Sequence, residues 1–256
     1  AAVAEESCRL ALYSDPECTD LITTAAARFG VEPDEVLMSN GSDEILNFAF
    51  MAFSDAAHPV VFPDITYGFY PVFAQLSGIP YETIPLMPDF SIRISDYMGI
   101  GRNIVIANPN APTGLALPVS DIEKIVSSNP GNVVVIDEAY VDFGAESTVP
   151  LIRKYPNLLV TGTFSKSRSM AGARLGFGIG DRALIRDLKT IQYSTNPYNV
   201  NRMTAAAGKA ALLDDGYYME NCRKIERTRE KTKQELESLG FHVTNSKANF
   251  LFAGSD

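Results

Sequence analysis

Histidine and cysteine are scarce in this sequence, and their scarcity limits the chemistry that the chain can perform. The two histidines, His58 and His242, leave little material for a histidine-based metal cluster or a Ser-His triad, so we interpret both as ordinary surface or core residues. The three cysteines (Cys8, Cys18 and Cys222) are odd in number and lack CxxC spacing. The sequence therefore indicates neither a metal site nor a disulfide framework.

Positive charge and long apolar runs are lacking as well. The 22 lysines and arginines against 31 aspartates and glutamates give a net charge of −9. This balance argues against a nucleic-acid partner, which needs many cationic contacts, but it is compatible with a local anion site. No apolar run approaches the length that crosses a bilayer, and the start AAVAEESCRL carries glutamates where a signal peptide is apolar. We therefore expect a cytoplasmic protein with no membrane partner.

Short apolar runs are present instead, and they predict a parallel sheet. They are rich in Val and Ile without polar alternation, as in strands buried on both faces, and they lie at residues 59–62, 103–107, 132–137 and 157–162. The segment 118–131 between two of them predicts a helix with Ser120 and Glu123 as a capping box, and another helix is predicted from Ser42. Strand, helix, strand is the repeating unit of an α/β sheet flanked by helices.

The pattern changes to helices from about residue 181. Helical segments follow at 181–191, 201–213 and 215–240, and two short strand-like runs lie within 241–254. We therefore predict a large α/β domain over residues 1–195 and the start of a smaller α+β domain over residues 196–256.

Polar side chains follow the apolar runs of the predicted sheet. They are Asn108 and Asn110 after the second run, Asp137, Glu138 and Tyr140 after the third, and Thr163, Ser165 and Lys166 after the fourth. Because ligands bind at the carboxyl ends of the strands in α/β sheets, we expect these side chains to meet in one crevice. We assign no role to Glu138.

This set of side chains matches the needs of pyridoxal phosphate. The cofactor needs a lysine that bonds to its aldehyde, a carboxylate that keeps its pyridine nitrogen protonated, and an anion cradle for its phosphate. Lys166 and Asp137 would supply the first two, although Lys166 in isolation would also suit a basic surface loop. The residues predicted to hold the phosphate are Ser42, Asp43, Thr163, Ser165 and Arg174. The amides at the start of the helix near Ser42 would add partial positive charge.

Five segments resemble a known family. NGSDE, FPDITYGFY, NPNAPTG, DEAYVDF and TFSKSRSMAGARLGF are similar, in order and spacing, to the fold-type I aminotransferases, and the resemblance extends over nearly the whole chain from Tyr13 onward. It implies that Lys166 bonds to the cofactor and later moves the proton between the substrate α-carbon and C4′. It also implies that Asp137 binds the pyridine nitrogen and that Tyr140 and Asn110 donate hydrogen bonds to O3′.

The resemblance further implies stacking and a dimer. Tyr67 would stack on the cofactor ring, with a role as an interface aromatic as the alternative, and Phe69 and Tyr70 are interpreted as core residues. Tyr13, in LYSDPE, resembles the tyrosine that the family lends across a dimer interface to the phosphate of the neighbouring subunit. A homodimer is therefore expected.

The sequence departs from the family in three places. Ala111 stands where many aminotransferases have the asparagine that bonds O3′, so Asn110 is our assignment and Asn108 its alternative. The segment with a NENP-type substrate loop that precedes LYSDPE in the family is absent, and so is the late part of the small domain with the arginine that binds the acidic group of the substrate. We therefore expect that the sequence is part of a longer chain, with a fragment that cannot complete its substrate site as the alternative.

Within the family, the motifs are closest to the branch that transfers an amino group between L-histidinol phosphate and 2-oxoglutarate, giving imidazole acetol phosphate and L-glutamate in histidine biosynthesis. Aromatic or branched-chain aminotransferases and threonine-phosphate decarboxylases share the scaffold and remain alternatives. A non-enzymatic module on this scaffold is disfavoured, because such a module would be free to lose Lys166, Asp137 and Arg174.

Overall fold

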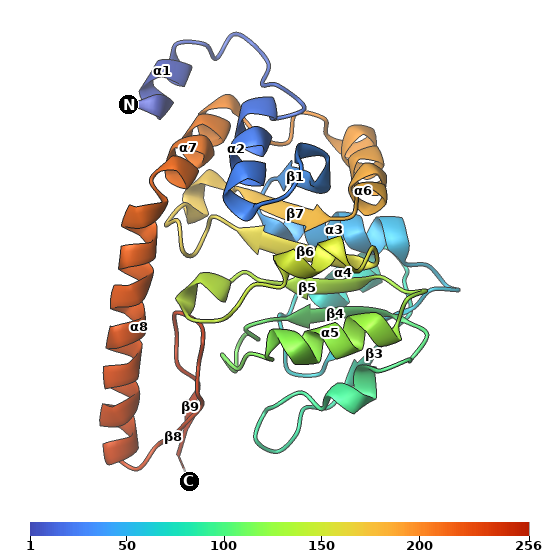
Figure 1. The fold of residues 1–256 in the computed structure, drawn as a ribbon, viewed down its shortest axis with the longest axis vertical. Helices are drawn as coiled ribbons and strands as arrows, with labels where there is room; N and C mark the ends of the chain where they lie inside the picture. The colour runs from blue at the N-terminus through green and yellow to red at the C-terminus, as the bar shows by residue number, and fades with distance from the viewer. Residues whose placement is uncertain (256) are drawn as a thin grey trace.

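The computed structural model describes residues 1–255. Its main sheet has seven strands in the order β1-β7-β6-β5-β4-β2-β3 (Figure 1). The strands are β1 (Val36–Ser39), β2 (Val60–Pro63), β3 (Tyr81–Ile84), β4 (Asn103–Ala107), β5 (Val134–Asp137), β6 (Leu158–Thr163) and β7 (Gly176–Gly180). Strands β3, β2, β4, β5 and β6 pair in parallel, whereas β7 is antiparallel to both of its neighbours. Strand β1 consequently runs in the same direction as β6.

Helices cover both faces of this sheet (Figure 1). One face packs on α2 (Thr19–Phe29), α5 (Val119–Ser128) and α7 (Arg202–Leu213), and the other packs on α3 (Ser42–Phe53), α4 (Tyr70–Leu76) and α6 (Arg182–Thr195). Alternate residues of each strand point into one of two separate apolar clusters, for example Ile104 and Ile106 into the first and Val105 into the second. Both faces are thus buried, which explains the unbroken Val and Ile runs of the sequence.

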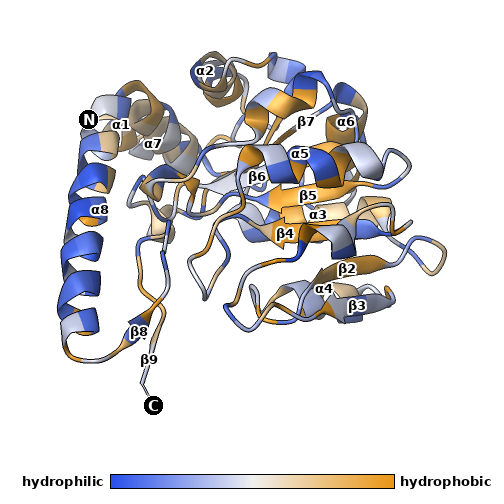
Figure 2. Cartoon of the chain, turned by 60° about the horizontal axis from the view of Figure 1, so that its bottom comes forward, coloured by the Kyte–Doolittle hydropathy of each residue, from blue (hydrophilic) through white to orange (hydrophobic). Residues whose placement is uncertain are grey.

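The C-terminal part extends away from the sheet along a single long helix. Helix α8 (Asp215–Ser238) is mostly hydrophilic (Figure 2), with Cys222 as its buried residue, and it leads to an antiparallel pair, β8 (His242–Val243) and β9 (Ala253–Gly254). The short helix α1 (Ala2–Ser7) packs on α7. Single 3-10 turns lie at Pro33–Glu35, Ile94–Tyr97, Val141–Phe143, Val149–Arg153 and Ala171–Ala173. The domain boundary at residue 195 stays a prediction.

The structure confirms the four predicted strands of the sheet and the predicted helices, but one helix cap differs and several further elements were not predicted. Helix α5 begins at Val119 after Pro118, so Ser120 lies inside the first turn and does not cap it. Strands β1, β3 and β7 and helices α1, α2 and α4 were not predicted. Strand β7, in the glycine-rich LGFGIG, makes the sheet mixed at one end. Between residues 1 and 255, no helix is both long enough and apolar enough to span a membrane.

Candidate active site

A pocket of about 140 Å³ lies at the carboxyl edge of the parallel strands. It is lined by Ser42, Asp43, Tyr67, Ala107, Pro109, Ala111, Asp137, Ala139, Tyr140, Thr163, Ser165, Lys166, Ala171 and Arg174. The structure therefore brings together nine of the eleven residues that the sequence analysis selected. The other two, Asn110 and Tyr13, lie outside the lining of this pocket in the described chain.

One end of the pocket is formed by Arg174 and the start of α3, and we call it the anion end. It lies where β7 separates β1 from β6. Gly176, the first residue of β7, pairs with Ser39 of β1 on one side and with Thr163 of β6 on the other. A Cβ atom on Gly176 would lie 2.3 Å from the backbone carbon of Gly41 and 2.3 Å from the amide nitrogen of Ser42. Only glycine at 176 lets the start of α3 approach the sheet so closely.

Arg174 closes the same end of the pocket from the loop before β7. Its backbone is left-handed, with φ of 54°, and its Nη2 lies 3.4 Å from Oδ2 of Asp43 in the first turn of α3. A Cβ atom on Gly41 would lie 2.6 Å from Nη2 of Arg174, so Gly41 leaves the room that the guanidinium occupies. Two glycines far apart in sequence thus place a guanidinium beside a helix N-terminus, an arrangement that binds anions.

Replacing Gly176 with Ala should damage this end of the pocket. The added Cβ must displace the backbone of Gly41 and Ser42, so we expect the free energy of unfolding, measured with urea, to fall by about 1–3 kcal/mol. We also expect a weaker affinity for inorganic phosphate, measured by calorimetry. Gly172→Ala is the matched control, because a Cβ on Gly172 has nothing within 4 Å. Equal effects of the two substitutions would contradict this account.

Asp137 is the buried carboxylate of the pocket. It ends β5 with 5% of its surface exposed. Its Oδ1 accepts hydrogen bonds from the amide of Ala139 (3.2 Å) and the hydroxyl of Thr161 (3.3 Å), and its Oδ2 accepts one from the hydroxyl of Tyr70 (3.0 Å). Burial raises the pKa of Asp137 to about 6, and these three bonds oppose the shift. Tyr70 and Thr161 were not selected from the sequence as site residues.

Lys166 and Tyr140 line the same pocket as Asp137. Lys166 is exposed, and its Nζ lies 5.3 Å from the ring centroid of Tyr140. The ring of Phe250, from the segment before β9, meets Tyr140 edge-on at 5.1 Å. An amine in contact with solvent and an aromatic face therefore border the same cavity, with a carboxylate at its floor.

Tyr67 connects the aromatic and anion parts of the pocket. Its hydroxyl donates to Oδ1 of Asp43 at 2.9 Å, and burial together with this carboxylate raises the pKa of Tyr67. Tyr70 is fully buried, as expected of a core residue, whereas Phe69 is 49% exposed, so the interpretation of Phe69 as core was wrong.

The side chains of Asn108 and Asn110, the two asparagines proposed for O3′, form hydrogen bonds with other residues of the protein. The Asn110 amide donates to the carbonyl of Ile65 and the hydroxyl of Thr113, and its oxygen accepts from the hydroxyl of Thr66. Asn108 exchanges two hydrogen bonds with the backbone of Leu117. The side chain of Asn110 is thus bonded to the segment at residues 65 and 66 and to Thr113, and Ala111, not Asn110, lines the cavity.

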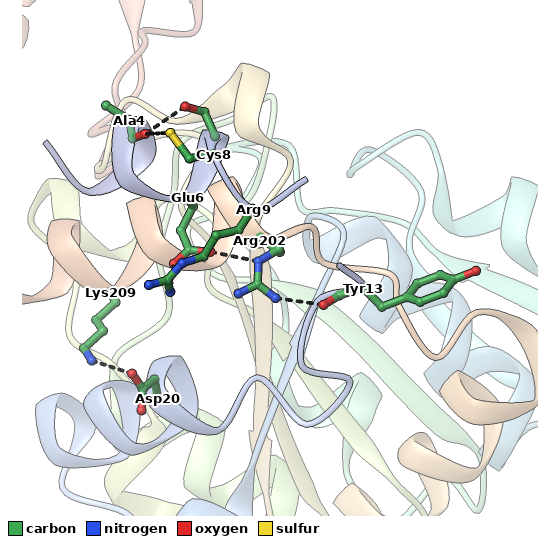
Figure 3. Close-up of polar contacts among 9 residues, drawn as sticks. Ala4, Glu6, Cys8, Arg9, Tyr13, Asp20, Arg202 and Lys209 are labelled. Carbon is green, nitrogen blue, oxygen red and sulfur yellow. Dashed lines mark hydrogen bonds and ion pairs between the residues drawn. The ribbon is translucent and has the colours of Figure 1, made fainter. Parts of the chain in front are cut away.

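Tyr13 lies away from the pocket of its own chain, in the segment after α1. Its side chain is 78% exposed and stacks on Tyr198 with a centroid separation of 4.5 Å. Arg202 fixes this segment, because its Nη1 donates to the carbonyl of Tyr13 (2.8 Å) and its Nε pairs with Glu6 (2.8 Å), as Figure 3 shows. The ring extends away from these contacts (Figure 3).

Glu138, next to Asp137, faces away from the pocket and anchors a loop. Its carboxylate accepts hydrogen bonds from the hydroxyl of Ser147 and from both the amide and the hydroxyl of Thr148. Burial raises the pKa of Glu138 to about 7. Its role is therefore structural.

The raised pKa values of Asp137 and Glu138 predict how stability depends on pH. A group whose pKa is higher in the folded state contributes stability that is full below its unfolded pKa and is lost as pH rises through the folded pKa. From pH 4 to pH 8, with no ligand added, we expect the free energy of unfolding to fall by up to about 3 kcal/mol for each carboxyl group. Urea unfolding across this range measures the slope, and Glu138→Gln should flatten it near pH 7. Carboxyl groups with lowered pKa, such as Glu17 and Asp215, act in the opposite direction, so the test is the difference between the two proteins. A pH dependence that Glu138→Gln leaves unchanged would contradict the assignment.

A mainly parallel sheet with a lysine, a carboxylate and an anion cradle at its carboxyl edge defines an α/β protein of fold type I. Sinorhizobium meliloti histidinol-phosphate aminotransferase, solved in complex with pyridoxal-5'-phosphate, shares this fold, with a TM-score of 0.90 and 24% identity over 98% of this chain and 70% of that one. The family model for aminotransferase class I and II matches residues 1–254, and the chain therefore belongs to that family.

Relatives in this family are similar over most of their length. Histidinol-phosphate aminotransferase from Aromatoleum aromaticum is 51% identical over 253 residues, which cover 97% of this chain and 71% of the relative. The enzyme of the same name from Brachyspira hyodysenteriae is 49% identical over 244 residues, which cover 95% of this chain and 69% of the relative.

Proposed function

We propose that this chain is a pyridoxal-phosphate-dependent aminotransferase of histidine biosynthesis, which interconverts L-histidinol phosphate and 2-oxoglutarate with imidazole acetol phosphate and L-glutamate. The observation that carries the proposal is the convergence of Lys166, Asp137 and Arg174 on one cavity. The names of the relatives at about half identity support the choice of substrate.

The pocket suits the proposed cofactor at both ends. At the anion end, the guanidinium of Arg174 lies beside the carboxylate of Asp43, which is where a phosphate dianion would compete. Gly41 leaves room for the guanidinium of Arg174, and Gly176 lets the start of α3 approach the sheet. The residues with hydroxyls for a phosphate are Ser42, Thr163 and Ser165. At the other end, the buried Asp137 has only neutral donors for partners, so it can still pair with a cationic ring nitrogen.

Each pocket residue then has a definite task. The bound cofactor supplies a protonated pyridine ring that accepts electrons from the substrate. Lys166 would hold the cofactor at its aldehyde, and as a free amine it would take the proton from the substrate α-carbon. Asp137 would hold the ring nitrogen, Tyr140 would donate to the phenolic oxygen, and Tyr67 would stack on the ring. Asn110 keeps the loop that carries Ala111 in place.

We also propose a cytoplasmic homodimer. The exposed ring of Tyr13 and its exposed neighbours Leu10 and Leu12 form an apolar surface suited to a second copy. Tyr13 of one chain would reach the phosphate held by the other.

Replacing Tyr13 with Phe tests this contribution across the interface. Because the lost hydroxyl would serve the neighbouring site, we expect cofactor affinity to fall by about 10-fold, consistent with a hydrogen bond to a charged group, while the dimer stays intact in analytical ultracentrifugation. Tyr217→Phe, at another exposed tyrosine, is the control. A monomer in solution that binds the cofactor fully would contradict the dimer proposal.

The reaction is tested by product analysis. The loaded protein is incubated with L-histidinol phosphate and 2-oxoglutarate, and in parallel with O-phospho-L-threonine. Glutamate formed only in the first mixture supports the proposal. Carbon dioxide released from phosphothreonine would favour the decarboxylase. A third mixture contains aromatic or branched-chain amino acids with 2-oxoglutarate, and glutamate formed only there would favour the other aminotransferases.

A further inference from the structure

We infer that Tyr70 is a positioning residue for Asp137, and that its buried hydroxyl keeps the carboxylate ionised and directed at the cofactor ring nitrogen. The inference rests on the proposed function. It concerns a residue that does not line the pocket and whose sequence pattern indicates only a core position.

Tyr70 is buried in the core, and its hydroxyl donates a hydrogen bond to Asp137. Tyr70 is the first residue of α4 and is 0% exposed, and its ring packs against Phe62 (5.7 Å between centroids) and edge-on against Tyr67 (5.6 Å). Its hydroxyl donates to Oδ2 of Asp137 at 3.0 Å. Because the ring is enclosed by core side chains, the hydroxyl cannot turn to solvent, and the bond fixes the direction of the carboxylate.

Tyr70 is also the strongest partner that favours the ionised form of Asp137. Burial raises the pKa of this carboxyl, and of the three hydrogen bonds that lower it the one from Tyr70 contributes most, ahead of those from Ala139 and Thr161. Donors to the charged form stabilise that form. An ionised Asp137 leaves the proton on the ring nitrogen, whereas a carboxyl of higher pKa would take the proton onto its own oxygen.

Other ionisable groups face Asp137 from neighbouring elements. Asp43, at the start of α3, raises the pKa of Asp137. The remaining ones lie in the pocket lining and are Tyr67, Tyr140, Lys166 and Arg174. All of them stay in place when only the hydroxyl of Tyr70 is removed, so a change in the state of Asp137 can be assigned to the one lost bond.

The variant Tyr70→Phe removes that bond and keeps the ring. With the cofactor labelled with ¹⁵N at the ring nitrogen, we expect the NMR signal of the bound cofactor to move from the protonated toward the unprotonated position near neutral pH. We expect kcat to fall by about 10- to 100-fold, the range for a lost hydrogen bond to a charged group, and its acidic limb to move to higher pH. Thermal unfolding checks that the variant folds.

Tyr97→Phe is the matched control. Tyr97 is also fully buried, at 1% exposure, and its hydroxyl has no hydrogen-bond partner among the described residues. Its replacement makes the same chemical change without removing a bond, so the nitrogen signal and kcat should stay within about twofold of the parent protein.

Two further variants separate positioning from packing. Incorporation of 4-aminophenylalanine at position 70 restores a donor, and it should return the nitrogen signal toward the protonated position. In an Asp137→Ala background, Tyr70→Phe should have no further effect on the signal or on kcat, because the two residues act as one unit. An undiminished effect in that background, or no rescue by the amine, would overturn the inference.

The outcome for the parent protein separates this inference from the function on which it rests. If the parent protein binds no pyridoxal phosphate, the proposed function itself fails. If the parent protein binds it with a protonated ring nitrogen and Tyr70→Phe behaves identically, the proposed function stands and the role of Tyr70 is wrong.

Discussion

Replacing Lys166 with Ala should reduce kcat by at least about 10⁴-fold, because the side chain serves both as nucleophile and as proton carrier. Lys166 is the lysine in the pocket lining, and its Nζ lies over the face of Tyr140. Borohydride reduction of the loaded parent protein, followed by digestion and mass spectrometry, should place the cofactor on the peptide that contains Lys166. The variant should yield no such peptide.

The control for this experiment is Lys231→Ala, which removes a lysine of α8 that has 77% of its side chain exposed and lies outside the pocket lining. It should leave both the rate and the labelled peptide unchanged. Cofactor found on a lysine other than Lys166 would refute the assignment of the nucleophile.

Replacing Asp137 with Asn should separate catalysis from stability. The amide is similar in shape but carries no charge, so it cannot hold the ring nitrogen protonated, and we expect kcat to fall by at least about 10²- to 10³-fold. Cofactor affinity should change far less. At pH 8 and without cofactor, the variant should be more stable by up to about 2 kcal/mol, because a buried unpaired charge has been removed.

The neighbouring carboxylate provides the control for Asp137. Glu138 is equally buried but bonds to Ser147 and Thr148, outside the pocket. Glu138→Gln should alter the free energy of unfolding and leave kcat within about threefold. Near-normal turnover of Asp137→Asn would count against the role of Asp137, whatever its stability.

Local sequence signals were enough to predict most of the parallel sheet and the reactive groups. Strands that are buried on both faces can be recognised in the sequence as runs of Val and Ile, and functional side chains follow their carboxyl ends. Lys166 and Asp137 were found in this way, Arg174 was selected as part of the predicted phosphate site, and the pocket lining includes all three.

The residues that were missed depend on contacts between distant segments. Tyr70 and Asp137 are 67 positions apart, and the approach of Gly176 to Gly41 is equally invisible in either motif alone. Strand β7 escaped prediction because three of its five residues are glycine, which is typical of loops and turns. The partners of Asn110 are equally hidden from its own motif, because Ile65 and Thr66, which bond to its side chain, lie 45 and 44 positions away; its bond to O3′ stays a prediction.

The central claim is that the pocket around Lys166 carries out amino transfer from L-histidinol phosphate. Its most direct test is a single-turnover absorption spectrum of the protein loaded with pyridoxal phosphate, recorded before and after addition of L-histidinol phosphate without keto acid. We expect the visible band of the lysine-bound cofactor to disappear and one equivalent of pyridoxamine phosphate to form per chain. A band that is present but unchanged by L-histidinol phosphate would contradict the assignment of the substrate. The absence of any band in the loaded protein would contradict the assignment of Lys166 and its pocket as the cofactor site.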